Sequence, residues 1–229
     1  LSDFDFKLPN ELIALRPADP RSSSKLLVSS GDEIIDDHFF NIIKYLKRGD
    51  RLVLNDTKVI PAKLSGQRIR YSDNGKTSAN IGVNLLSMIK EGHWLALVKP
   101  AKRVNVGETI HFGKDLNALV LEKSPDGLLL KFNMSEENFE KKLETLGKMP
   151  LPPYIASQRL PDELDDNDYQ TVFAKHSGSV AAPTASLHFD NMILKQLIDC
   201  GIKISKVTLH VGAGTFLPVK VNNIADHKM

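Results

Sequence analysis

The chain has 229 residues, of which 41% are hydrophobic and 25% charged, so it can bury one large core or two smaller ones and does not have the composition of a disordered protein. Its 30 Lys and Arg against 28 Asp and Glu give a net charge of +2, which excludes a wholesale polyanion binder and limits any nucleic-acid contact to a local basic patch. One cysteine excludes intrachain disulfides and a cysteine-built zinc site. No apolar run approaches the ~18 residues of a transmembrane helix, so we expect a cytoplasmic protein that makes no membrane contact.

The first 60 residues combine helix-like and strand-like patterns, which is typical of a mixed α/β segment. Residues 8–15 predict a short helical turn that begins near Pro9, and residues 25–30 predict a strand. In residues 36–50 the apolar side chains repeat at helical spacing and the segment ends at a glycine, which predicts an amphipathic helix. Residues 51–56 then predict a buried strand.

From residue 61 to residue 133, short strand-like runs recur between turn signals such as "DNG" and "SPDG". This spacing favours a small β-barrel or sandwich. A helix should follow, with Ser135 as its N-cap and Gly147 just past its end. The predicted strands are 81–89, 93–100, 108–112, 117–122 and 128–133.

After the predicted barrel and its helix, helix-like and strand-like patterns again occur together. Three prolines in residues 149–155 predict a stiff extended connector, and the acidic run 161–169 predicts a solvated loop. Residues 190–201 predict a helix with Asp190 as N-cap, and residues 206–214 a strand that runs into a glycine-rich loop.

These elements together predict a mixed α/β fold interrupted by an all-β barrel. We expect a discontinuous α/β catalytic domain formed by residues 1–60 and 150–229, and an inserted β-barrel domain with a short helix formed by residues 61–149.

Two small-residue segments carry candidate chemistry. "GSVAAPTASLHF" (178–189) contains His188, and "GAG" (212–214) follows a strand two residues after His210. Small residues let a backbone approach a ligand closely, but the same residues also form tight turns, and each histidine alone is more often structural. Asp56, directly after a strand, has two interpretations: an Asx-type turn, or a base at the strand's carboxyl end.

A basic cluster lies in the predicted barrel. Lys99, Lys102 and Arg103 surround a proline, with Trp94 just upstream. A charge run of this kind is usually a solvated face, although cations beside an aromatic residue on a β-barrel are also typical of RNA binding. Further cations that would extend the patch are Lys58, Lys63, Arg68 and Arg70.

Six segments, in chain order, resemble the S-adenosylmethionine:tRNA ribosyltransferase-isomerase family of queuosine biosynthesis. They are "DFDFKLPNELIALRP", "GDRLVLNDTKVIPAKLSG", "HWLALVKPAKR", "MPLPPYI", "DYQTVFAKHSGSVAAPTASLHF" and "VTLHVGAGTFLPV". Members of that family are longer, so the resemblance implies that the catalytic domain continues after residue 229. It also implies an α/β domain with an inserted β-barrel.

The resemblance implies a specific reaction. The ribosyl part of S-adenosylmethionine is transferred to 7-aminomethyl-7-deazaguanine at the wobble position of the tRNA anticodon stem-loop. The sugar is isomerised to give epoxyqueuosine, and adenine and methionine are released. S-adenosylmethionine is a substrate here, and we expect neither a cofactor nor a metal, and a monomer.

The sulfonium acidifies the adjacent ribose carbon, so this chemistry requires a base. The candidates for base and acid, in order, are His188, His210 and Asp56. The residues expected to line the S-adenosylmethionine pocket are Ala181, Pro183, Thr184, Gly212, Gly214 and Thr215. The residues expected to bind tRNA are Lys99, Lys102, Arg103 and Lys58.

Three other functions compete with this one. A tRNA-guanine transglycosylase is disfavoured because that family has a cysteine-rich zinc site. An S-adenosylmethionine-dependent methyltransferase would need a glycine-rich loop after its first strand, which is missing near the start of this chain. A non-catalytic RNA-binding module explains the basic cluster but gives no purpose to the two small-residue segments.

Overall fold

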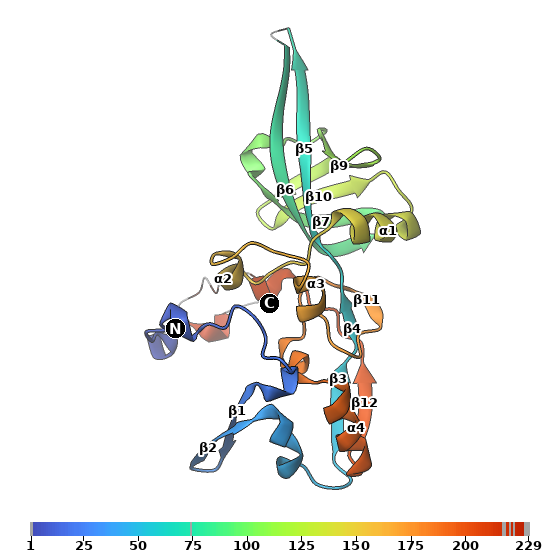
Figure 1. The fold of residues 1–229 in the computed structure, drawn as a ribbon. Coiled ribbons are helices and arrows are strands. Elements are labelled where there is room, and N and C mark those ends of the chain that lie inside the picture. The colour runs from blue at the N-terminus through green and yellow to red at the C-terminus, as the bar shows by residue number, and fades with distance from the viewer. Residues whose placement is uncertain (1, 74, 217–218, 220, 222, 227–229) are drawn as a thin grey trace.

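A closed antiparallel β-barrel forms one end of the molecule (Figure 1). The structure is a computed structural model that describes residues 2–73, 75–216, 219, 221 and 223–226. The barrel has the strand order β10-β7-β6-β5-β8-β9, and the predicted barrel is thereby confirmed. Its strands are β5 (Lys63–Ser72), β6 (Gly75–Lys90), β7 (His93–Lys99), β8 (Thr109–Phe112), β9 (Leu116–Ser124) and β10 (Gly127–Phe132).

The barrel forms because its strands alternate between buried and more exposed side chains. In β7, Trp94, Ala96 and Val98 are buried while the residues between them are half-buried. Helix α1 (Glu136–Leu146) covers part of the barrel, and the ring of its Phe139 lies 4.4 Å from that of Phe132. One apolar core therefore joins the helix to the barrel.

Two neighbouring glycines of the barrel give a matched test of how tightly this core is packed. A Cβ atom on Gly66 would lie 2.7 Å from both the carbonyl oxygen of His111 and the buried ring of Phe112, whereas one on Gly82 would meet only Lys99 O, at 3.6 Å. We expect Gly66→Ala to lower the free energy of unfolding by about 1–3 kcal/mol, because the core cannot accept the extra methyl group. Gly82→Ala should change it by about 0.5 kcal/mol or less. Urea unfolding measures both, and equal losses would contradict the packing described.

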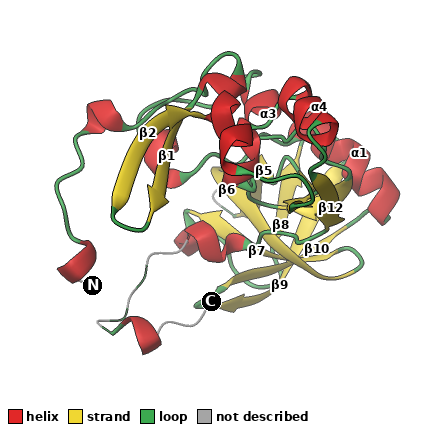
Figure 2. Ribbon diagram, turned by 90° about the horizontal axis from the view of Figure 1, so that it is seen from below, coloured by secondary structure: helices red, strands yellow, loops and turns green. Residues whose placement is uncertain are grey.

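The remaining residues form a mixed α/β part with its own core. A hairpin of β1 (Lys25–Ser30) and β2 (Glu33–His38) stands apart from the barrel strands (Figure 2). Two parallel pairs complete the sheets: β3 (Arg51–Asn55) with β12 (Lys203–Val207), and β4 (Thr57–Val59) with β11 (His176–Ser179). The helices are α2 (Pro153–Ala156), α3 (Asp165–Asp168) and α4 (Asn191–Asp199). The second core contains Phe39, Leu54, Phe189, Ile193, Leu197 and Ile202.

The predicted mixed α/β fold with a β-barrel is thus confirmed, whereas the division into separate domains at residues 61 and 149 stays a prediction. Within the described part of the chain, no helix is both long and apolar enough to cross a membrane.

The chain enters the barrel at Lys63 and leaves it near Lys148, and these two segments lie side by side. The backbones of Lys63 and Lys148 exchange two hydrogen bonds, of 3.1 and 2.8 Å. Gly147, the residue before Lys148, has a φ of −77°, so it does not have the left-handed conformation of a typical helix-ending glycine. Its role is close approach, because a Cβ atom there would overlap the carbonyl oxygen of Pro61.

Four of the predicted elements were wrong. The strand predicted within residues 206–214 is β12, which ends at Val207 because the side chain of Asn55, and not a backbone, pairs with Leu209. Residues 36–50 contain a 3₁₀ helix, Phe39–Tyr45, because aromatic and β-branched residues favour the α-helix weakly and no side chain caps its start. The connector 149–155 contains the start of α2, because Pro153 occupies the first helical position, where proline is tolerated. The acidic run 161–169 is not a solvated loop: it forms α3, and Asp165 is fully buried. By contrast, Asp190 caps α4 as predicted and accepts from the Ile193 N–H at 2.9 Å.

Candidate active site

Asp56 is the residue between β3 and β4, which follow one another along the backbone. At Asp56 the neighbouring strand changes from β12 to β11. Its N–H donates to the carbonyl oxygen of Val207 at the end of β12 (2.9 Å), and its own carbonyl oxygen accepts from the N–H of Lys175, just before β11 (2.8 Å). The Asn55 side chain continues the pairing, because it both donates to and accepts from the Leu209 backbone, at 2.8 and 3.0 Å. β12 and β11 therefore follow one another along a single strand (Figure 1). Ligands of α/β sheets bind beyond the carboxyl ends of the strands, and β12 ends at this point.

The two small-residue segments meet at this point. The Val180 N–H donates to the carbonyl oxygen of Val211 (3.1 Å), and the Val211 N–H donates to Ser179 Oγ (2.9 Å). The Ser179 hydroxyl in turn donates to the carbonyl oxygen of Ala181 (2.7 Å). Segments 178–189 and 206–214, far apart in the sequence, thus form one wall.

The Asp56 carboxylate is buried inside this wall. Its Oδ1 accepts from Thr208 Oγ1 at 2.7 Å, and its Oδ2 lies 3.9 Å from His176 Nε2. The whole residue is 5% exposed. In this position the carboxylate holds the segment after β12 against the start of β11.

His210 is the histidine that the wall presents to solvent. Its Nδ1 lies 2.8 Å from Oγ1 of Thr57, a residue that is fully buried in β4. The imidazole rests on Gly178, where a Cβ atom would lie 2.8 Å from Cε1 of the ring. Thr57 and Gly178 therefore fix the position of the ring, and Nε2 is the nitrogen left for a substrate.

A cavity of about 320 Å³ opens in front of His210, between the wall and the barrel. A cavity of this size can hold part of a nucleoside or an amino acid. Its apolar side comes from the barrel and α1, and its polar side from the wall and two glutamates of α1. The lining includes Trp94, Met88, Phe139, Glu136, Glu140, Ser177, Gly178, His210 and Gly212.

His188 lies in a different cavity, of about 460 Å³, within the α/β part. It ends the 3₁₀ helix Thr184–His188, its Nδ1 lies 3.0 Å from the carbonyl oxygen of Ala185, and its ring packs 5.4 Å from that of Phe39. The structure therefore brings His210 and Asp56 together but places His188 apart from them. The role of each residue stays a prediction.

The residues expected to line the S-adenosylmethionine pocket do not all lie in one cavity. Gly212 lines the His210 cavity, and Thr184 lines the His188 cavity. Ala181 is buried in the wall and lines neither cavity. Pro183 and Gly214 lie in segments 178–189 and 206–214, and Thr215 directly follows the second segment; none of the three lines either cavity.

The cations expected to bind tRNA do not all lie in one patch. Lys99 ends β7, and Lys102 and Arg103 lie in the short 3₁₀ helix that follows; all three side chains are exposed on the barrel. Lys58 lies in β4, away from this cluster, with its Nζ 3.9 Å from Glu144 of α1.

Two of the further cations do not extend the patch. Arg68 is buried and donates to the carbonyl oxygen of Arg103 at 3.0 Å, and Arg70 pairs with Glu108.

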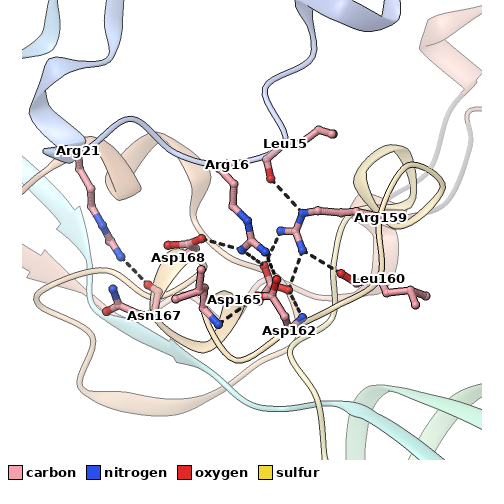
Figure 3. A network of polar contacts seen from close by, with 10 residues as sticks. Leu15, Arg16, Arg21, Arg159, Leu160, Asp162, Asp165, Asn167 and Asp168 are labelled. Carbon is pink, nitrogen blue, oxygen red and sulfur yellow. Dashed lines mark hydrogen bonds and ion pairs between the residues drawn. The ribbon is translucent and has the colours of Figure 1, made fainter.

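Sequence reasoning missed an ion-pair network, which Figure 3 shows. It lies beside the His188 cavity, because Arg16, Arg159 and Asp168 help to line that cavity. The guanidinium groups of Arg16 and Arg159 both bind the buried carboxylate of Asp165, each through a contact of 2.9 Å. Arg16 also binds Asp168, at 3.0 Å, and Asp162. The available signal was an unusually acidic run next to "QR", with an arginine inside the N-terminal motif "ALRP".

Comparison with known proteins gives a consistent result. A family model described as "Queuosine biosynthesis protein" matches residues 1–229. Two proteins called S-adenosylmethionine:tRNA ribosyltransferase-isomerase, from Ruegeria sp. and Ruegeria pomeroyi, are 54% and 56% identical, with 100% of this chain and 66% of each relative covered. The chain thus spans about two thirds of the length of these curated relatives. The crystal structure of S-adenosylmethionine tRNA ribosyltransferase from Thermotoga maritima is 30% identical, with 91% of this chain and 58% of that chain covered and a TM-score of 0.36.

Proposed function

Because the chain belongs to the queuosine biosynthesis protein family, we propose that it transfers and isomerises the ribosyl group of S-adenosylmethionine onto 7-aminomethyl-7-deazaguanine at the wobble position of tRNA. The product is epoxyqueuosine, and adenine and methionine leave. The match over 229 residues and the meeting of segments 178–189 and 206–214 support this proposal.

The proposed roles follow from the chemistry of the sulfonium. The positive sulfur makes the hydrogens on the neighbouring ribose carbon acidic, so a base must lie beside that carbon. We assign this role to Nε2 of His210, because the ring is fixed by Thr57 and faces a cavity. Asp56 then acts as a positioning residue, since its carboxylate is buried and accepts from the hydroxyl of Thr208, two residues before His210.

The partners follow from the same proposal. The chain would bind S-adenosylmethionine and the tRNA anticodon stem-loop, as a monomer, in the cytoplasm where tRNA is modified. The sulfonium carries its own leaving group, so we propose that the reaction needs neither a metal nor a prosthetic group.

The decisive experiment incubates the purified protein with S-adenosylmethionine and tRNA that carries the aminomethyl-deazaguanine base. Release of adenine together with methionine, in step with modified tRNA, supports the transferase. Methylated RNA with S-adenosylhomocysteine would instead identify a methyltransferase, and binding without any product an RNA-binding module.

The exposed cations of the barrel give a second test. Replacing Lys102 and Arg103 with alanine should weaken tRNA binding and reduce the slope of log K against log salt by about one for each phosphate that the variant no longer neutralises. Lys195→Ala, an exposed cation on α4, is the matched control and should change neither quantity. Binding titrations at several salt concentrations measure the effect. Unchanged tRNA affinity in the double variant would remove this cluster from the RNA interface.

A further inference from the structure

The His188 cavity has the size and lining of a ligand site. Its volume of about 460 Å³ falls within the range of small-molecule pockets. Apolar walls come from Leu15, Pro17, Ile155 and Leu187. These residues come from the N-terminal segment, α2 and the segment that ends at His188, so the cavity lies where three distant parts of the chain converge.

Several polar groups that line this cavity have no hydrogen bond to another described residue. They are the hydroxyl groups of Tyr154, Tyr169 and Thr184, the ammonium group of Lys25 and Nε2 of His188. Tyr169 is half-buried, and burial raises the pKa of its hydroxyl, so this group remains a donor at neutral pH. His188 is half-buried as well, whereas the side chains of Lys25, Tyr154 and Thr184 are exposed. Half-buried polar groups normally find partners within the protein, so the unused hydroxyl of Tyr169 and the unused Nε2 of His188 indicate a polar ligand.

Arg16 contributes a planar, positively charged guanidinium group to the lining of this cavity. Both of its terminal nitrogens bind carboxylates of the 162–168 segment, so its guanidinium group is held in place (Figure 3). What it can still offer to a ligand is the face of the guanidinium plane. Arginine planes and tyrosine rings are the surfaces on which nucleobases stack in proteins.

We propose that this cavity binds a nucleoside that carries an anionic group. The base would stack against Tyr154 and Arg16, while Lys25 and His188 hold the anion. This inference rests on the proposed function, in which two ligands have this chemistry. One is the wobble nucleotide with its phosphate, whose binding here leaves the His210 cavity to S-adenosylmethionine. The other is S-adenosylmethionine itself, with its adenosine and carboxylate, whose binding here would place its ribose beside His188 and not beside His210.

The test measures binding rather than turnover. The variants are Lys25→Ala and Tyr154→Ala, both at exposed side chains whose loss should leave the melting temperature unchanged, and the control is Lys195→Ala. S-adenosylmethionine binding is followed by calorimetry, and tRNA binding by filter retention. We expect each cavity variant to weaken the binding of one ligand about tenfold, because removal of a stacked ring or of a charged partner costs this much.

The two binding measurements identify the ligand. Weaker S-adenosylmethionine binding with unchanged tRNA binding assigns the cavity to the sulfonium nucleoside, and the reverse assigns it to the wobble nucleotide. Unchanged binding of both ligands in both variants would overturn the inference. Adenine release by the wild-type protein decides the proposed function separately, so failure of one conclusion can be told from failure of the other.

Discussion

Replacing Asp165 with asparagine should lower the free energy of unfolding by about 3–5 kcal/mol, the cost of breaking a buried ion pair. The carboxylate is fully buried and accepts from Arg16, from both terminal nitrogens of Arg159 and from the Asp162 N–H. Asparagine is nearly isosteric but carries no charge, so the guanidinium group of Arg159, whose side chain is only 15% exposed, loses its counter-ion. Denaturant unfolding of wild type and variant measures the difference.

A neighbouring residue supplies the control. Asp166 follows Asp165 in α3 but is exposed. Partial burial raises the pKa of its carboxyl, and the negative charges of Asp165 and Glu163 raise it further. Its negative charge is therefore not stabilising, and Asp166→Asn should leave the stability unchanged or slightly higher. An equal loss in both variants would mean that general charge, and not the arginine network, stabilises this helix.

The same network predicts a dependence on pH. Burial alone raises the pKa of Asp165, but the hydrogen bonds from Arg159 and the Asp162 N–H and the charges of Arg159 and Arg16 outweigh it, so the pKa lies below its ordinary value. A carboxyl with a lowered pKa in the folded state stabilises the protein above its unfolded pKa of about 3.9 and loses that contribution as the pH falls toward the folded value. The stability difference between wild type and Asp165→Asn should therefore be full at neutral pH and shrink below about pH 4. A difference that stays constant to pH 3 would contradict this assignment.

Five of the six strands of the barrel were predicted from the sequence because each carries its own signal, whereas β5 was not among the predicted strands. In β7 the buried positions alternate, and turn residues separate β9 from β10, so each strand and its hairpin partner follow from nearby residues. The acidic run 161–169 has no such local signal. One of its two arginine partners, Arg16, lies 149 residues away from Asp165, and a carboxylate without a visible partner is ordinarily expected in solvent.

The candidate site was partly predictable for the same reason. His188, His210 and Asp56 each stand out beside small residues or at a strand end, and these features are local. Which of them share a cavity depends on long-range hydrogen bonds such as that from Val180 to Val211 and on the exchange of strand partners at Asp56. The composition of a segment contains no information on those pairings, so the separation of His188 from His210 became visible only in three dimensions.

The largest effect on activity is expected at His210. If its Nε2 removes the proton next to the sulfonium, His210→Ala should lower kcat for adenine release by about 10²–10⁴, the usual contribution of a general base. The side chain is exposed, so the melting temperature should change little. His188→Ala should instead raise KM more than it lowers kcat, because this residue lines the separate cavity proposed to bind a nucleoside. Normal turnover in His210→Ala would end the proposal that this residue is the base.

Thr57 allows a sharper test of the same site. Thr57→Val keeps the β-branched shape of this fully buried residue but removes the hydroxyl that lies 2.8 Å from His210 Nδ1, whereas Thr57→Ser keeps the hydroxyl. We expect valine to lower kcat about tenfold or more and to displace the pH profile of kcat, because the ring loses the partner that fixes its tautomer and orientation. Serine should restore most of the activity and the wild-type profile. If both variants lost activity equally with unshifted pH profiles, Thr57 would contribute packing to β4 rather than position to the imidazole.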